Sequence, residues 1–149
     1  MVTRAALLAF LRAHRLATQA SVSAVRGVQA AVVGIAVTDD FELVFDTLAT
    51  TRKAENIARD SRVAFVIGGT LAGEEQTVQY EGVADRLTGA ELSRFQEIYL
   101  EVFPDGRDRL AWPGLIYVRV KPRWLRYSDY RSDPPAILEL TGLELAVLA

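Results

Sequence analysis

The chain has 149 residues, of which 50% are hydrophobic and 24% charged, as is usual for globular proteins. Its net charge of −2, with both signs interspersed, disfavours a nucleic-acid surface, and the absence of cysteine excludes disulfides, thiolate metal sites and a cysteine nucleophile. One histidine cannot form a multi-histidine metal site. No apolar run is long enough to span a membrane and the N-terminus lacks a signal-peptide layout, so we expect one domain, residues 1–149, in the cytoplasm.

A helix is predicted from Thr3 to about His14, within an N-terminal helical segment of residues 1–15. Its apolar residues recur at spacings of three and four, as on a helix with one buried face. His14 lies at the end of this stripe, near the helix C-terminus, where a histidine is common. We therefore interpret His14 as structural rather than catalytic.

Three strands are predicted next, over residues 16–25, 30–38 and 42–47. The first alternates small side chains with β-branched ones, and Arg26-Gly27 marks the turn that follows it. The second is almost entirely apolar, which predicts a strand buried on both faces. A turn at residues 38–40 leads into the third strand, so these elements form a meander.

The third strand ends at a group of hydroxyl residues followed by two cations. Thr50 or Thr51 can serve as the N-cap of a short helix that runs from about Lys53 to Asp60. Arg52 and Lys53 then lie in its first turn, where the helix dipole disfavours positive charge. A bound phosphate would remove this conflict, whereas the simpler alternative is a solvated surface turn.

The second half of the chain adds three strands, a helix and a tail. Strands are predicted over residues 63–67, 77–87 and 115–127, with a bulge at Gly82 and a bulge or sheet edge at Pro122. Thr88 and Glu91 have the spacing of a capping box, which opens a helix that ends near residues 103–106. The apolar end of the tail, residues 128–149, is expected to dock on the body or on a partner subunit. Six short strands with these irregularities predict a small barrel with helices outside it.

The segment from Phe45 to Ile57 resembles the phosphate-holding segment of the pyridoxamine 5′-phosphate oxidase family, the flavin mononucleotide (FMN) binding split barrels. In that family a strand ends in an aromatic residue and a threonine, and a hydroxyl-Arg-Lys triplet opens a short helix. The order of elements extends the resemblance from about Ala5 to Tyr127. It implies a mainly β, α+β fold, a six-stranded antiparallel split β-barrel of Greek-key type with peripheral helices. Four positions match the phosphate pattern: Thr47, Thr51, Arg52 and Lys53.

The resemblance also implies further contacts to the flavin. A strand glutamine of the family falls at Thr77, with Gln76 and Gln79 nearby as substitutes. The family's C-terminal Arg-x-His pair has no match, although aromatic and cationic residues occupy that region. The resemblance implies no catalytic side chain and no metal ligand, because the flavin carries the redox chemistry. The implied cofactor-binding residues are therefore Thr47, Thr51, Arg52, Lys53, Thr77, Gln79, Trp124 and Arg126.

Two departures from the family pattern narrow the expected function. The positions of a strand arginine and a strand lysine that contact FMN carry Ala31 and Ala36. The Arg-x-His pair, which grips the substrate's phosphate in the family, is also missing, so recognition of pyridoxamine phosphate is expected to be lost. The resemblance then implies an FMN-binding oxidoreductase with an unknown small-molecule substrate. The alternatives are a reductase that uses the deazaflavin F420 and a split-barrel binding protein without catalysis.

The family's flavin lies between two subunits, so the resemblance also implies a homodimer with the cofactor at its interface. Three aromatic residues could wall that groove, or could instead belong to the barrel core: Trp112, Trp124 and Tyr127.

Overall fold

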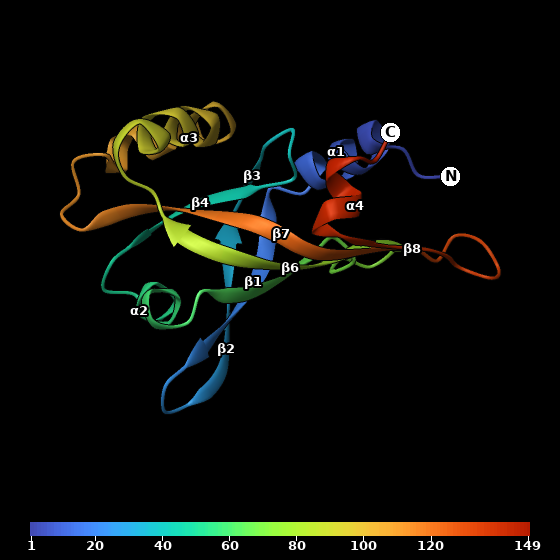
Figure 1. Ribbon diagram of the computed structural model, residues 1–149, viewed down its shortest axis with the longest axis horizontal. Helices are drawn as coiled ribbons and strands as arrows, with labels where there is room; N and C mark the ends of the chain where they lie inside the picture. Colours follow the sequence, from blue (N-terminus) through green and yellow to red (C-terminus); the bar gives the residue numbers. More distant parts are fainter.

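The computed structural model describes residues 1–149 as one antiparallel sheet that curls into a half-barrel, with helices on its outside and at its ends (Figure 1). The mainly β, α+β split-barrel fold is therefore confirmed. None of the helices is both long and apolar enough to cross a membrane. The helices are α1 (Arg4–Ala13), α2 (Arg52–Arg59), α3 (Gly89–Val102), the 3₁₀ helix η1 (Pro104–Arg109) and α4 (Gly142–Ala146), and the strands are β1 (Leu16–Ser23), β2 (Gly27–Gly34), β3 (Ala36–Val37), β4 (Leu43–Leu48), β5 (Arg62–Ile67), β6 (Gln76–Arg86), β7 (Leu115–Asp129) and β8 (Ala136–Thr141).

The strand order is β2-β1-β5-β6-β7-β4-β3, and β8 pairs separately with β7. β2 and β3 stand at opposite ends of this order, yet only Ile35 separates them in the chain. The sheet must curl for one continuous segment to pair with β1 at one end and with β4 at the other. The predicted count of six strands is therefore wrong in two places, because residues 30–38 divide between two partners and the tail supplies β8.

The prediction that the second strand is buried on both faces is also wrong. β2 begins earlier than predicted, and its alternate residues Val28 and Val32 are 74% and 66% exposed. Only Val33 in this strand is buried. One face of β2 therefore stays in solvent although its side chains are apolar.

The main core fills the inside of the curled sheet. Phe45, Phe65 and Tyr80 are fully buried and meet edge to face, with ring centroids 6.4 and 5.9 Å apart along this chain of three rings. The Tyr80 hydroxyl donates to the carbonyl oxygen of Phe41 at 2.9 Å, so its polar atom is satisfied inside the core. A second, smaller core lies beneath α3 and includes Phe95 and Tyr99.

The predicted bulge is confirmed, and it decides which side chains β7 presents to solvent. Glu81 pairs with Trp124 while the next residue, Gly82, pairs with Pro122, so Arg123 is an extra residue in β7. Before the bulge Val120 points into the core, and after it the odd-numbered Leu125 does. Trp124 and Arg126 are thereby turned to the outer face of the sheet.

The capping box predicted at the start of α3 is wrong. Thr88 is the N-cap residue, but its side chain makes no capping hydrogen bond. The Glu91 carboxylate instead accepts from Arg119 at 3.2 Å, and the same guanidinium bonds to Asp85 at 3.0 Å. This long-range ion pair holds α3 against the sheet.

The tail docks on the body of the same chain. β8 pairs with β7 along Trp124–Asp129, and α4 buries Leu145 to 1% exposure. Thr141 opens α4 with a capping box in which the carboxylate of Glu144 accepts the Thr141 N–H at 2.7 Å. Leu138, Leu140, Leu145 and Leu148 of the tail therefore pack on this chain's own core, whereas Ile137, Leu143 and Val147 stay exposed.

Candidate functional site

A hollow of about 400 Å³ lies where the N-terminus of α2 meets β1 and β2. It contains three of the predicted site residues together with polar side chains from the two strands. We call it the α2 pocket. Its lining residues are Gln19, Ser21, Gln29, Ala30, Ala31, Thr50, Thr51, Arg52 and Lys53.

Two threonines build the helix start at this pocket. The Thr51 hydroxyl caps α2 by accepting from the Ala54 N–H at 3.4 Å, and it donates to the Leu48 carbonyl oxygen at 2.9 Å. The Thr47 hydroxyl lies 2.9 Å from that of Thr51, and it must be the donor because the Thr51 proton is already used. Thr47 is buried and does not line the pocket, so it fixes the capping threonine.

Arg52 and Lys53 place two cations at the mouth of the pocket. Neither side chain forms an ion pair or a hydrogen bond within the chain. Both residues lie in the first turn of α2, where backbone N–H groups have no intrahelical acceptor. Two unpaired positive charges and the positive end of a helix dipole therefore converge on one hollow, which is an arrangement that binds phosphate.

The floor of the pocket carries a buried amide network that the sequence did not predict. The Asn56 amide nitrogen donates to the Ser21 hydroxyl at 3.0 Å and to the Gln29 side-chain oxygen at 2.9 Å. Gln19 lies beside this network with 1% of its surface exposed, and neither its Nε2 nor its Oε1 has a hydrogen-bond partner. The available signal was alternation, because Ala17, Gln19 and Ser21 share the buried face of β1.

The remaining predicted residues lie elsewhere in the chain. Thr77, Gln79 and Trp124 line a separate hollow of about 280 Å³ on the outer face of β1, β5, β6 and β7. Arg126 is the register partner of Gln79 on the same face, and it bonds to Glu139 of β8 at 2.7 Å. Within one chain the eight predicted residues therefore form two groups rather than one site.

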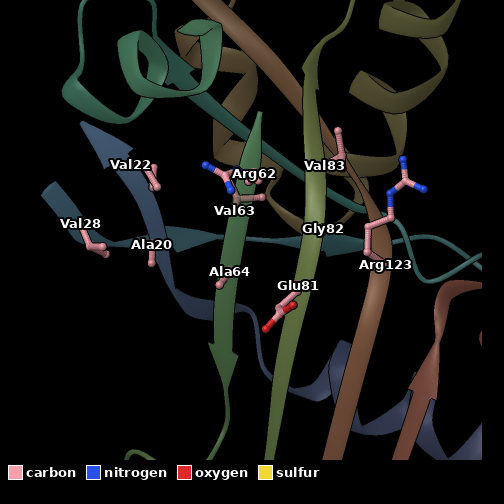
Figure 2. A pocket seen from close by; sticks show the side chains of 11 residues that line it. Ala20, Val22, Val28, Arg62, Val63, Ala64, Glu81, Gly82, Val83 and Arg123 are labelled. Atoms are coloured by element: carbon pink, nitrogen blue, oxygen red, sulfur yellow. The ribbon is translucent and has the colours of Figure 1, made fainter. Parts of the chain in front are cut away.

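A hollow of about 570 Å³ lies between the two groups (Figure 2). It shares Ser21 with the α2 pocket, and it shares Ala20, Ala64 and Glu81 with the hollow beside Trp124. Its floor is mainly apolar, with small and β-branched residues from four strands. Figure 2 shows this floor and the charged side chains around it: Ala20, Val22, Val28, Ala64 and Val83, with Arg62, Glu81 and Arg123.

We call the solvent side of β1, β2, β5, β6 and β7 the outer sheet face. Its register rows run from β2 across β1 and β5 to β6 and β7, so that Ala20 pairs with Ala64 and Ala64 with Glu81. One of its charges is already neutralised, because Arg62 bonds to Asp60 at 2.7 Å and lowers the pKa of that carboxyl to about 2. The face is therefore broad, open and largely apolar.

Three other residues singled out from the sequence are now placed. Ala31 lines the α2 pocket, whereas Ala36 is 1% exposed in the second core beneath α3 and lies away from that pocket. Tyr127 belongs to the main core, where its ring meets Phe10 edge to face at 5.6 Å.

His14 caps α1, with Nδ1 2.8 Å from the Phe10 carbonyl oxygen and Nε2 3.3 Å from Glu74 Oε1. Both ring nitrogens thus have local partners. No group of three or more histidine, aspartate or glutamate side chains gathers where it could hold a metal ion.

The model of the family described as pyridoxamine 5′-phosphate oxidase matches residues 3–129, which is most of the chain. The chain belongs to the pyridoxamine 5′-phosphate oxidase family. The matched residues include the α2 pocket, the outer sheet face and all of β7. A search of curated proteins gave no match.

Solved structures share this family fold at low sequence identity. The heme-binding protein from Mycobacterium smegmatis superposes with a TM-score of 0.81 at 18% identity, over 97% of this chain and 60% of its own. A conserved protein from Mycobacterium tuberculosis gives 0.72 at 25% identity, over 88% and 87%. A pyridoxamine 5′-phosphate oxidase-related, FMN-binding protein from Nostoc punctiforme gives 0.69 at 12% identity, over 92% and 87%. The chain thus spans about three fifths of the length of the first of these proteins.

Proposed function

We propose that this protein is an FMN-binding oxidoreductase of the family and that the α2 pocket holds the FMN phosphate. The observation that carries the proposal is the convergence of unpaired donors on one hollow. Arg52 and Lys53 lack partners in the chain, and the helix N-terminus adds free N–H groups. Arginine can hold a phosphate with two parallel hydrogen bonds while lysine adds a point charge, so together they match a dianion.

The working unit is a homodimer that joins the two groups of predicted residues. Thr77, Gln79, Trp124 and Arg126 lie on the outer sheet face, apart from the α2 pocket of their own chain. A second copy packed on this face would bring its own outer residues toward the flavin of the first. Much of the tail packs on its own chain, although Leu143 and Val147 stay exposed, so the proposal rests on the outer sheet face.

When bound, the flavin supplies the redox chemistry, and the chain supplies binding and orientation. Arg52 and Lys53 would hold the phosphate, and Thr47 with Thr51 would keep the helix start in place for them. Trp124 offers an aromatic surface on the outer sheet face and Gln79 an amide beside it. No side chain needs to act as a general acid or base in this arrangement.

The test is a titration of the purified protein, stripped of any bound cofactor, with FMN, monitored by flavin fluorescence. Saturable binding of FMN, with riboflavin bound at least tenfold more weakly, is expected because only FMN presents a phosphate to the pocket. Riboflavin is the matched control, since it differs from FMN by the phosphate alone. Absence of saturable FMN binding would contradict the proposal.

Two alternatives remain within the same fold. The cations of the α2 pocket could serve the phosphate of F420, in which case the same titration would show binding of F420 and not of FMN. A binding protein without catalysis is favoured by Ala31, which lines the pocket where the family places a cation. That alternative predicts a protein that binds neither flavin.

Heme binding does not fit the histidine that this chain offers. An axial histidine needs a free ring nitrogen directed into a cavity. His14 has Nδ1 at Phe10 O and Nε2 at Glu74 Oε1, and it lines none of the hollows described above. We therefore do not extend the heme-binding property of the Mycobacterium smegmatis protein to this chain.

We expect no turnover of pyridoxamine phosphate, even with FMN bound. The substrate's phosphate must be held so that its amine carbon faces the flavin, and positioning of this kind supplies about 7–11 kcal/mol of a barrier. Arg126 is engaged with Glu139, and no histidine follows it on β7. The assay supplies FMN-loaded protein with pyridoxamine phosphate and oxygen and measures pyridoxal phosphate and peroxide. Robust turnover that Arg126→Ala abolishes would contradict this prediction.

A further inference from the structure

The loop of residues 68–75, which joins β5 to β6, contacts the end of α1 through Glu74. One carboxylate oxygen of Glu74 lies 3.3 Å from Nε2 of His14, the C-cap residue of α1. The other oxygen accepts from the backbone N–H groups of Thr70 and Leu71 at 2.9 and 3.0 Å. Glu74 therefore holds its own loop together on one side and contacts α1 on the other.

The hydrogen bonds of His14 are complete only when its imidazole is protonated. Nδ1 lies 2.8 Å from the carbonyl oxygen of Phe10, and a carbonyl oxygen can only accept, so Nδ1 carries a proton. A neutral imidazole has one proton, so its Nε2 would then direct a lone pair at the Glu74 carboxylate. A positively charged imidazole donates from both nitrogens and bonds to Phe10 and Glu74 together.

Glu74 keeps its negative charge around neutral pH, which leaves His14 as the member of the pair that changes. The pKa of Glu74 lies below its ordinary value, chiefly because the Leu71 N–H bonds to the carboxylate, with further lowering by the Thr70 N–H and by His14. His14 is the one charged group among these causes, and Glu74 is the one carboxylate within 4 Å of the His14 ring. Histidine is the side-chain type that changes its charge between pH 5 and 8.

The same contact reaches the outer sheet face through Gly68, the first residue of the loop. A Cβ added to Gly68 would lie 2.7 Å from the Phe10 ring and 3.2 Å from Nε2 of His14, so the loop begins directly against these two side chains. The Gly68 carbonyl oxygen accepts from the Thr77 hydroxyl at 3.2 Å. Thr77 lines the hollow beside Trp124, so the start of the loop fixes one polar group of that hollow.

We propose that His14 and Glu74 form a pH-sensitive latch on loop 68–75, closed while His14 is protonated and loosened when it is neutral. The sign follows from the contact, because a bond that needs the proton stabilises the closed loop at low pH and is lost as the pH rises. Loosening of the loop frees the carbonyl oxygen that anchors Thr77. The latch does not depend on which cofactor the α2 pocket holds.

Amide hydrogen exchange measured by NMR, with rates corrected for the intrinsic effect of pH, tests the latch. Thr70 and Leu71 are the reporters, because their N–H groups bond to Glu74. Their protection is expected to fall about two- to fivefold from about pH 5.5 to about pH 8, which is the scale of a partly exposed ion pair. The Arg26 amide, which bonds to the Ser23 hydroxyl in the β1–β2 turn, is the internal control and should keep its protection.

Two substitutions should each abolish the pH response of the reporters. His14→Gln carries no charge at any pH. Glu74→Gln keeps an oxygen that can accept from Thr70 and Leu71 but loses the negative charge, and it also serves if the His14 variant does not fold. Glu75→Gln is the matched control, because Glu75 is the neighbouring exposed carboxylate and forms no ion pair, so this variant should respond to pH as wild type does.

A pH response that wild type and Glu75→Gln share, and that His14→Gln and Glu74→Gln lack, supports the latch. Equal protection of the reporters at both pH values in wild type overturns it. A response that persists in His14→Gln, or one that appears equally at the Arg26 amide, overturns it as well, because another group or a general loosening of the fold would then be the cause. The measurement uses protein without cofactor, so its outcome is separate from that of the FMN titration.

Discussion

Replacement of Arg52 by alanine is expected to raise the Kd for FMN by ten- to a hundredfold while leaving the fold intact. A hydrogen bond to a charged group contributes about 1.5–3 kcal/mol, which corresponds to this range of affinity. The Arg52 side chain is exposed and forms no hydrogen bond or ion pair within the chain. Its removal also takes a cation away from the positive end of a helix dipole, so the melting temperature should not fall.

Arg86→Ala is the matched control for this experiment. Arg86 is an exposed arginine at the end of β6, it forms no ion pair, and it lies outside the α2 pocket. The control should bind FMN as wild type does, at the same ionic strength. If Arg52→Ala also binds FMN as tightly as wild type, the phosphate is not held at the start of α2.

The start of α2 was predictable from the sequence because all of its determinants are local. Thr51, Arg52 and Lys53 are adjacent in the chain, and the rules for helix capping and for the helix dipole apply within one turn. The structure places all three on one pocket. Gln19 was not predictable in the same way, because its surroundings come from β1, β2 and α2, which meet only after folding.

The division of the remaining predicted residues follows from strand register, which the sequence leaves open. The inward–outward alternation of side chains along β7 shifts by one residue at Arg123. This single extra residue turns Trp124 and Arg126 outward and Tyr127 inward. Pro122 predicts an irregularity in this strand, but it does not predict which of the following side chains face outward. The apolar run of residues 30–38 was wrongly predicted to be buried on both faces, because an exposed apolar strand and a doubly buried one have the same composition.

Replacement of Ala64 by arginine is expected to separate the proposed homodimer into monomers. Ala64 lies between Ala20 and Glu81 in the register of the outer sheet face and lines both hollows there. Its side chain points away from the core, so an arginine can extend into solvent in the isolated chain. In a two-fold interface each subunit would add a charge to an apolar region, and charge of one sign brought together costs several kcal/mol.

The measurement is light scattering coupled to size exclusion at micromolar protein. Wild type is expected at about twice the chain mass of 16.4 kDa and Ala64→Arg at the chain mass itself. Ala90→Arg introduces the same side chain on the exposed first turn of α3 and should leave the mass at the wild-type value. The FMN affinity of Ala64→Arg is expected to be lower than that of wild type, because in a monomer the residues around Trp124 no longer reach the flavin of a partner. A wild-type mass near 16.4 kDa, or an Ala64→Arg protein that stays dimeric, would show that the outer sheet face is not the interface.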